Sequence, residues 1–371
     1  MMKILFCIHS LVSGGAENIL VNTINELSRL DRFSIDLLIL VNDRSLADKL
    51  DSNVRIISIF KNHSKIERRL VKYLPATLLN KMFVRGKYDI EIAFLEGDST
   101  KVIGGANSRV PKVAWVHTDV NNFPWSTKFY ISDRQEFETY KKYDRVLGVS
   151  KDVAREFTKK FNLPCSFAMN IIDYNTIIGK SREVLEETYE KDWFNFISVG
   201  SLKKIKGYER LITIYTKIKN MGLKVRQYIV GEGPERQFLE QKIKENNLQN
   251  YIILKGYKSN PYPWIFQADA LVCCSYAEGY SSVVAEAIIL KKVVITTECS
   301  GMREILGDSE WGVIVANNET ALASGMLRIV EDKKWYNYYE QKAAERSKFF
   351  ANSNQGKQLA NIFFETVDKH E

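Results

Sequence analysis

Two glutamates, Glu278 and Glu286, have seven residues between them in a segment suited to a phosphorylated ligand. Glu278 follows an apolar run typical of a buried strand, and Ser281 or Ser282 can cap the helix that comes next. The unpaired amides at a helix start attract anions such as phosphates. Two carboxylates beside such an anion site would accept hydrogen bonds from sugar hydroxyls. We therefore expect this segment to hold a sugar and a phosphate together.

A second turn places three lysines, Lys203, Lys204 and Lys206, just after a strand predicted over residues 194–199. Ammonium groups at a strand end could clamp a diphosphate, and Lys206 is the best candidate. A solvated loop is the alternative, and it accounts for most lysine clusters.

Two glycine turns also follow predicted strands. Gly14 and Gly15 come after the first strand, and Gly231 and Gly233 stand directly before Pro234. Neighbouring glycines let backbone amides approach a phosphate or a sugar, and a proline suits the first position of a helix. An ordinary tight turn explains Gly14 and Gly15 equally well, while the turn at Gly231 and Gly233 could hold a base or ribose but is a weak signal by itself. The full G-x-G-x-x-G spacing is absent, which removes the main support for a nicotinamide cofactor.

The elements that position these turns alternate between strand and helix, in two series. Strands are predicted at residues 3–9, 35–40, 90–94, 112–115 and 145–149, and again at 194–199, 224–230, 251–255, 270–274 and 293–296. Helices are predicted at residues 16–29, 150–160, 208–221 and 234–246, and over much of 335–368. The pattern implies two parallel sheets, each with helices on both faces. Where two such domains face each other, ligands bind beyond the carboxyl ends of the strands.

The composition of the 371 residues is that of a globular protein, with 45% hydrophobic and 26% charged residues. Disordered and fibrous classes are excluded, and no apolar run approaches the length of a membrane span. The five cysteines and four histidines are scattered, which argues against a disulfide framework, a zinc site or any other metal cluster. Unpaired cysteines favour a reducing cytoplasm.

The net charge of +8 is concentrated in one segment, Lys61–Lys87, which holds eight basic residues and one acidic residue. Its apolar residues recur at four-residue spacing: Ile66, Leu70 and Leu74, then Leu78 with Met82 and Leu79 with Phe83. Such a segment could lie on an anionic membrane with its apolar side in the lipid interface. The alternative is a helix whose apolar side packs on its own domain. Binding of nucleic acid by this segment has little support, since few aromatic residues lie among the basic ones.

Taken together, these motifs resemble those of the family-4 retaining glycosyltransferases of GT-B architecture. The resemblance covers nearly the whole chain through ordered motifs: the pair Gly14 and Gly15, Asn170 with Asp173, Lys206 with Gly207, Gly231 to Pro234, Glu278 to Glu286 as an E-x7-E element, and Gly301 to Glu304. It implies two facing, doubly wound Rossmann-like domains. The N-terminal one, residues 1–170, would bind the acceptor, and residues 171–349 would bind the nucleotide sugar. The last helix, within residues 350–371, would pack back on the N-terminal domain.

The resemblance also implies roles for individual residues. Glu286 would bind the ribose hydroxyls, Glu278 the transferred sugar, and Lys206 the leaving diphosphate. His117 would lie near the sugar, although an ordinary loop histidine is the alternative. The other residues expected to contact the donor are Gly14, Gly15, Ser201, Lys203, Gly231, Gly233, Gly279, Tyr280, Ser281, Ser282 and Val283.

Three positions depart from the family pattern. Ser201 stands where an arginine usually follows the glycine, and Lys203 or Lys204 could replace it without its bidentate fork. Ser281 occupies a position that is usually glycine, which could alter sugar selectivity. Lys291-Lys292 replaces a turn of a small residue and a proline, with no readable consequence.

The resulting expectation is a retaining glycosyltransferase that moves a hexose or N-acetylhexosamine from a nucleotide-diphosphate sugar, with UDP favoured over GDP. The acceptor would be a saccharide or a lipid-linked saccharide used in cell-surface polysaccharide or glycoconjugate synthesis. No D-x-D pair is present, so neither a metal nor another cofactor is expected. The protein would be cytoplasmic and peripheral on the inner face of the cell membrane. The alternatives are a nucleotide-sugar epimerase or a sugar phosphorylase of related fold and, less favoured, a basic nucleic-acid-binding protein.

Overall fold

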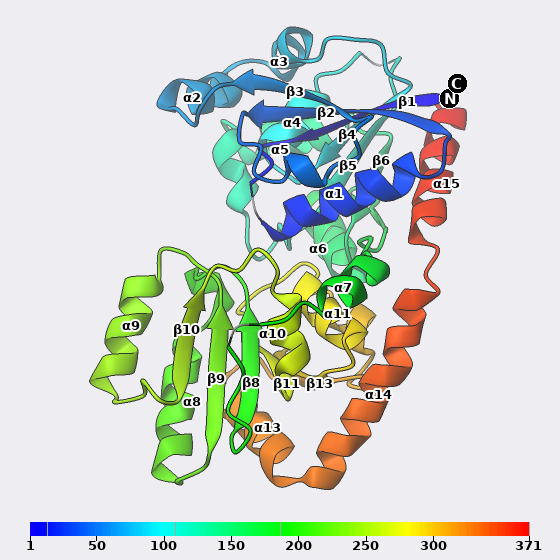
Figure 1. Cartoon of the computed structure of the whole chain (residues 1–371). Helices are drawn as coiled ribbons and strands as arrows, with labels where there is room; N and C mark the ends of the chain where they lie inside the picture. Colours follow the sequence, from blue (N-terminus) through cyan, green and yellow to red (C-terminus); the bar gives the residue numbers. More distant parts are fainter. Residues whose placement is uncertain (13, 108, 186, 371) are drawn as a thin grey trace. The chain divides into compact units, whose positions relative to one another are not determined.

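The computed structural model describes residues 1–12, 14–107, 109–185 and 187–370, which form two compact units (Figure 1). Unit 1 comprises Met1–Ile171 and Asn354–Glu371, and unit 2 comprises Ile172–Ser353. The borders between the domains were expected after residues 170 and 349. In the structure they lie after residues 171 and 353.

Unit 1 is built on a parallel seven-stranded sheet in the order β3-β2-β1-β4-β5-β6-β7. Its strands are β1 (Met2–Ile8), β2 (Phe33–Val41), β3 (Arg55–Phe60), β4 (Ile90–Phe94), β5 (Lys112–Val116), β6 (Arg145–Gly148) and β7 (Ser166–Phe167). Its helices are α1 (Gly15–Ser28), α2 (Lys65–Tyr73), α3 (Ala76–Phe83), α4 (Asp98–Ile103), α5 (Asp133–Tyr140), α6 (Lys151–Phe161) and α15 (Gln355–Asp368), with 3₁₀ turns η1 (Ala47–Lys49) and η2 (Trp125–Phe129). The central strands are almost wholly apolar because both faces of the sheet are covered.

Unit 2 is built on a parallel six-stranded sheet in the order β10-β9-β8-β11-β12-β13. Its strands are β8 (Phe194–Val199), β9 (Val225–Val230), β10 (Ile252–Gly256), β11 (Ala270–Cys273), β12 (Val293–Thr297) and β13 (Val313–Val315). Its helices are α7 (Tyr174–Lys180), α8 (Glu209–Asn220), α9 (Arg236–Glu245), α10 (Tyr262–Gln267), α11 (Ser282–Ile289), α12 (Met302–Leu306), α13 (Glu319–Glu331) and α14 (Lys333–Ala351), with the 3₁₀ turn η3 (Lys204–Lys206).

In both units the strand order reverses beside the first strand of the unit. The reversal falls between β1 and β4 in unit 1, and between β8 and β11 in unit 2. In open parallel sheets, ligands bind outside the carboxyl ends of the strands at such a switch point. The loops after these four strands are therefore the places to look for chemistry.

The fold confirms two doubly wound parallel-sheet domains of Rossmann type. Three strands were not predicted, namely β3, β7 and β13, and the last two have only two and three residues. The helical tail predicted over residues 335–368 is two helices, α14 in unit 2 and α15 in unit 1. The α15 residue Phe363 places its ring 6.2 Å from that of Phe6, so this last helix covers the sheet of unit 1.

Candidate active site

The loops after β8 and β11 bring Lys206 and Glu278 together at the switch point of unit 2. Lys206 Nζ lies 2.6 Å from Glu278 Oε1, and Ser275 Oγ donates to the same oxygen at 2.6 Å. The side chains of the pair are 25% and 10% exposed, so the ions meet in a poorly solvated setting. Lys206 and Glu278 were both predicted from the sequence, whereas Ser275 was not.

Lys206 keeps its charge at this position. Burial lowers the pKa of Lys206, but the nearby Glu278 carboxylate outweighs this effect and leaves the pKa above its ordinary value. An ammonium group has three N–H donors, and Glu278 takes one of them. Two donors therefore remain for the oxygens of a diphosphate.

The backbone of Lys206 is fixed against the loop after β11. Gly207 has a φ of +67°, and a Cβ at this position would lie 2.3 Å from the carbonyl oxygen of Cys274. The Cys274 thiol donates to the Lys206 carbonyl at 3.2 Å, and the Tyr276 amide donates to the Ile205 carbonyl at 2.8 Å. Only a glycine permits this approach, which explains the lysine–glycine pair.

Helix α11 begins beside this pair with its first amides open. Ser281 is the N-cap residue, but its side chain makes no capping hydrogen bond, and its buried Oγ has no partner among the described residues. The buried Tyr280 hydroxyl likewise has none there. The backbone at Gly301, which has a φ of +79°, passes close to that of Gly279. A Cβ on residue 301 would lie 2.3 Å from the Gly279 carbonyl oxygen, so only glycine fits there. These groups form the polar surroundings that a bound phosphate requires.

Glu286 lies in the second turn of α11 and is half-buried. Burial raises its pKa from an ordinary 4.5 to about 7. No hydrogen bond or ion pair of its carboxylate is found within the part of the chain that the structure describes. Its charge is near enough to Tyr262 of α10 to raise the pKa of that phenol. A carboxylate that is crowded and unpaired is ready to accept hydrogen bonds from a ligand.

The glycines of the β9 turn serve close packing of the two neighbouring loops. A Cβ at Gly231 would lie 1.9 Å from the Gly200 oxygen, and one at Gly233 would lie 2.6 Å from the Leu202 oxygen. Close packing of the backbone thus requires a glycine at both positions. Ser201 is half-buried and Lys203 is exposed on the adjoining loop.

His117 of unit 1 is a neutral imidazole. It follows β5, and burial lowers its pKa to about 3. Its Nε2 is buried without a partner among the described atoms. Its backbone amide donates at 2.9 Å to Glu96, which also accepts from Trp125 Nε1 at 2.7 Å. Glu96 was not predicted, although its place after β4 was a signal that could have identified it.

The predicted glycine pair opens α1 in unit 1. Gly14 is the N-cap residue, and a Cβ there would meet the Glu17 carboxylate. A Cβ at Gly15 would have no described atom within 4 Å, so the backbone at Gly15 is open to a ligand.

Two sequence expectations about unit 1 are wrong. The histidines are not all dispersed, because His9 and His63 have ring centroids 4.9 Å apart. The apolar residues of Lys61–Lys87 do not share one outward side. Leu79 and Phe83 of α3 are buried, and the Phe83 ring packs 5.4 Å from that of Phe60. The cause is that Pro75 divides the segment into two helices, α2 and α3.

Comparison with known proteins finds one matching family model, several related sequences and solved structures of the same fold. Residues 182–346 match the family model described as "Glycosyl transferases group 1". The chain is 29% identical to the N-acetylgalactosamine-N,N'-diacetylbacillosaminyl-diphospho-undecaprenol 4-alpha-N-acetylgalactosaminyltransferase of Campylobacter jejuni, over 94% of this chain and 96% of that protein. It is 26% identical to a GalNAc-alpha-(1->4)-GalNAc-alpha-(1->3)-diNAcBac-PP-undecaprenol alpha-1,4-N-acetyl-D-galactosaminyltransferase of the same organism, over 94% and 95%.

Among solved structures, the chain resembles the Anabaena protein HepE in complex with UDP-glucose, with a TM-score of 0.76, 18% identity and full coverage of both chains. This likeness confirms the fold. The transferase relatives also favour glycosyl transfer over the epimerase, phosphorylase and nucleic-acid-binding alternatives. The chain is a glycosyltransferase of GT-B fold, and its residues 182–346 are similar to the group 1 glycosyl transferases.

Proposed function

We propose that the chain is a retaining transferase that moves an N-acetylhexosamine or a hexose from a UDP-sugar to a saccharide carried on a diphospho-polyprenol. The observation that carries the donor site is the half-buried Lys206–Glu278 pair beside the open start of α11. The acceptor class is supported by the two Campylobacter jejuni relatives, whose names specify diphospho-undecaprenol-linked saccharides. Retention of anomeric configuration is supported by the resemblance to the retaining family.

The proposed chemistry is electrostatic. As the glycosidic bond to the diphosphate breaks, negative charge grows on the departing oxygens. Lys206 and the α11 amides would stabilise this charge from fixed positions, which lowers the barrier more than it strengthens ground-state binding. Glu278 would orient the sugar by accepting from its hydroxyls, and Glu286 would do the same for the ribose.

Donor identity is tested first by thermal shift with UDP-GalNAc, UDP-GlcNAc, UDP-glucose and GDP-mannose, because only a bound donor raises the melting temperature. The stabilising donor is then incubated with a diphospho-polyprenol-linked saccharide, and the anomeric configuration of the product is read by NMR. We expect an α-linked product from an α-linked donor. A β-linked product would overturn retention, and conversion of the donor sugar without acceptor would favour the epimerase alternative.

We propose that no metal assists donor binding, since Lys206 and the α11 start can meet the diphosphate charge. The affinity for the UDP-sugar, measured by calorimetry, should be the same in excess EDTA and in Mg²⁺ or Mn²⁺. A loss in EDTA that Mg²⁺ restores would contradict this assignment of the phosphate site.

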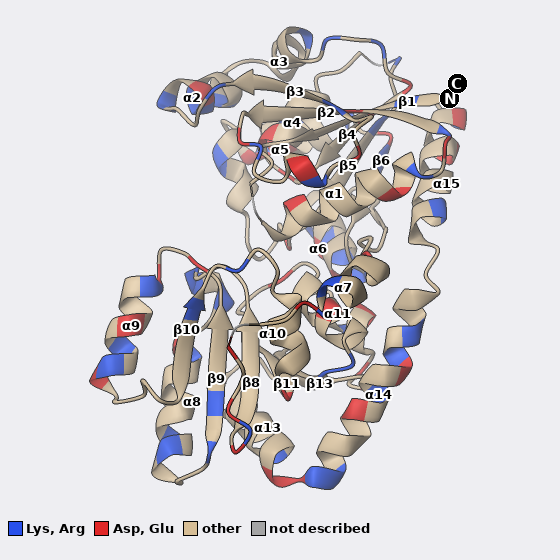
Figure 2. Cartoon of the chain, in the orientation of Figure 1, with Lys and Arg blue, Asp and Glu red and all other residues tan. Residues whose placement is uncertain are grey.

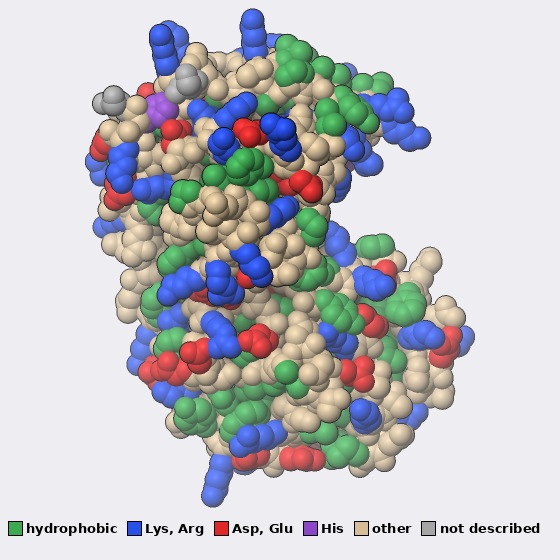
Figure 3. Space-filling model, turned by 180° about the vertical axis from the view of Figure 1, so that it is seen from behind, with side chains coloured by type: hydrophobic (Ala, Val, Ile, Leu, Met, Phe, Trp, Pro, Cys, Tyr) green, Lys and Arg blue, Asp and Glu red, His purple; other side chains and the backbone are tan. Residues whose placement is uncertain are grey.

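We further propose that unit 1 binds the inner face of the cell membrane through the segment Lys61–Lys87. Lys and Arg colour much of α2 in Figure 2, and exposed apolar side chains accompany them on α2 and α3: Ile66, Tyr73, Leu78 and Met82. In Figure 3 basic and hydrophobic side chains adjoin at the end of unit 1 where α2 lies. This mixture fits an anionic lipid interface, where each basic residue contributes about 1 kcal/mol. No helix in the described ranges is long and apolar enough to cross a membrane.

Liposome co-sedimentation tests this docking. Binding should appear with anionic vesicles, weaken with salt, and fall when Arg68, Arg69 and Lys72 become Ser. The matched control replaces three lysines of unit 2 with Ser and removes the same charge: Lys217, Lys244 and Lys334. Equal binding by both triple variants, or indifference to lipid charge at low salt, would refute a dedicated membrane surface.

A further inference from the structure

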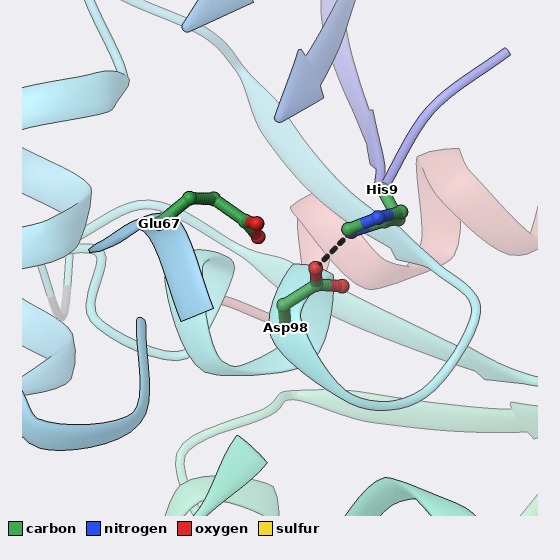
Figure 4. A group of neighbouring side chains, drawn as sticks. All are labelled: His9, Glu67 and Asp98. Atoms are coloured by element: carbon green, nitrogen blue, oxygen red, sulfur yellow. Dashed lines mark hydrogen bonds and ion pairs between the residues drawn. The ribbon is translucent and has the colours of Figure 1, made fainter. Parts of the chain in front are cut away.

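The switch point of unit 1 holds a cluster to which the proposed glycosyl transfer assigns no role. His9 follows β1, Asp98 begins the helix after β4, and Glu67 reaches the same place from α2. One ligand-type atom from each residue lies within 4.8 Å of the other two. Figure 4 shows the three side chains pointing toward one another from three separate elements.

The burial of Glu67 is not explained by an ordinary ion pair. Its side chain is wholly buried, and neither carboxylate oxygen has a hydrogen-bond partner among the described residues. His9 Nδ1 bonds to Asp98 Oδ2, so that pair is satisfied without Glu67. A buried carboxylate without a partner is costly and calls for a cation or a donor at its oxygens.

Glu67 also forgoes the local partner that its sequence offers. Ser64 and Glu67 have the spacing of a capping box, in which the glutamate would turn back to the backbone amide of the serine. Only half of that box forms: Ser64 Oγ accepts from the Glu67 amide at 3.0 Å. The carboxylate instead points toward His9 and Asp98 (Figure 4). The local preference is therefore overridden in favour of this cluster.

His63 supports His9 from outside the cluster. His63 Nδ1 lies 3.3 Å from His9 Nε2, while His9 Nδ1 faces the carboxylates. When His9 carries its proton on Nε2 and donates it to His63, the lone pair on Nδ1 is directed at the two acids. A histidine that binds a metal through one nitrogen usually donates from the other in this way.

We propose that His9, Glu67 and Asp98 bind a divalent transition-metal ion of the Zn²⁺ class in unit 1. One imidazole and two carboxylates are established ligand types for such ions, and their two negative charges would be balanced by the ion. On binding, the ion would replace the His9 proton and draw Glu67 inward to bond lengths of about 2.0–2.2 Å. The side chain of His9 is 33% exposed, which gives the ion a route in from solvent.

The proposed ion would also join α2 to the sheet. Glu67 is in α2, which carries the basic residues proposed to meet the membrane, whereas His9 and Asp98 follow neighbouring strands. Binding by all three ligands would fix the position of α2 on unit 1. The three proposed ligands belong to unit 1, whereas Lys206, Glu278 and Glu286 belong to unit 2.

The test is calorimetric titration of the untagged, chelator-treated full chain with ZnCl₂ and with CoCl₂. We expect one equivalent to bind, with a Co²⁺ spectrum that lacks thiolate bands, and a higher melting temperature with Zn²⁺. Glu67→Gln, Asp98→Asn and His9→Gln should abolish the saturable site, and His63→Ala should weaken it by ~10-fold or more. The matched control is His370→Gln, because His370 pairs with Asp144 at 2.7 Å in a place without a third ligand among the described residues.

The control should bind one equivalent as the unaltered chain does. Absence of saturable binding by the unaltered chain would overturn the proposal. So would equal binding by folded Glu67→Gln, or a thiolate band in the Co²⁺ spectrum. If one ligand variant fails to fold, the other two ligand variants and the Co²⁺ spectrum of the unaltered chain still test the proposed metal site.

Discussion

Replacing Lys206 with Ala should lower kcat by ~100-fold or more, as expected when one fixed electrostatic donor to a developing charge is removed. The structure supplies the physical reason. Lys206 is held as an ammonium by Glu278 at 2.6 Å, with two N–H groups left for the diphosphate. Because these interactions strengthen as the bond to the diphosphate breaks, their loss affects the transition state more than the bound donor. Steady-state kinetics with the stabilising UDP-sugar and a diphospho-polyprenol-linked acceptor measure the effect.

The matched control is Lys242→Ala, which removes another ion-paired lysine of unit 2, 2.8 Å from Glu245. It should leave kcat unchanged. The Lys206→Arg variant retains the charge, but a guanidinium cannot take the same position beside Glu278. Its kcat should therefore lie between those of Lys206→Ala and Lys242→Ala. If Lys206→Ala changes KM alone, the lysine contributes only uniform binding and its proposed role is wrong.

The sequence predicted the frame of the fold because the central strands carry strong signals. Buried parallel strands such as residues 270–273 are continuous apolar runs between loops, and this pattern can be recognised without tertiary information. The strands β7 and β13 have two and three residues, too few for any periodicity. The division of the tail into α14 and α15 depends on which unit each helix packs against, which local sequence does not encode.

The site residues, like the strands, were predictable where a local sequence pattern marks them and not where only the fold brings them together. Lys206 and Glu278 were placed at strand ends by pattern, and the neighbouring order of β8 and β11 brings them into contact. Their partner Ser275 had no motif to mark it, and the buried Glu96 had only its place after β4. A metal cluster was not expected because the histidines are far apart in sequence, yet the pairing of β1 with β4 brings the residues that follow them, His9 and Asp98, together. Three-dimensional clusters of this kind arise from topology rather than from spacing along the chain.

Replacing Glu286 with Gln should weaken UDP-sugar binding by about 10- to 100-fold, as expected for the loss of one charge-assisted hydrogen bond of roughly 1.5–3 kcal/mol. The fold should survive. Burial raises the pKa of this carboxyl from 4.5 to about 7, so its ionisation lowers stability as pH rises between those values. The amide introduced by the Glu286→Gln substitution has no such ionisation, and the melting temperature of the variant at pH 8 should equal or exceed that of the unaltered chain.

The pH dependence of donor binding gives the sharper measurement. In the proposed role, ribose hydroxyls would donate to the ionised carboxylate of Glu286, so the affinity of the unaltered chain should rise with pH up to about 7 and then level off. Below the pKa the affinity should fall by up to ~10-fold per pH unit, because the donor must bind the minor ionised form. Calorimetry with a UDP-sugar between pH 5.5 and 8.5 measures this, and the Glu286→Gln variant should show no dependence near pH 7. A matched control is Glu240→Gln on α9, which should behave as the unaltered chain. If Glu286→Gln retains the same affinity and the same pH dependence, the ribose-binding role belongs to another residue.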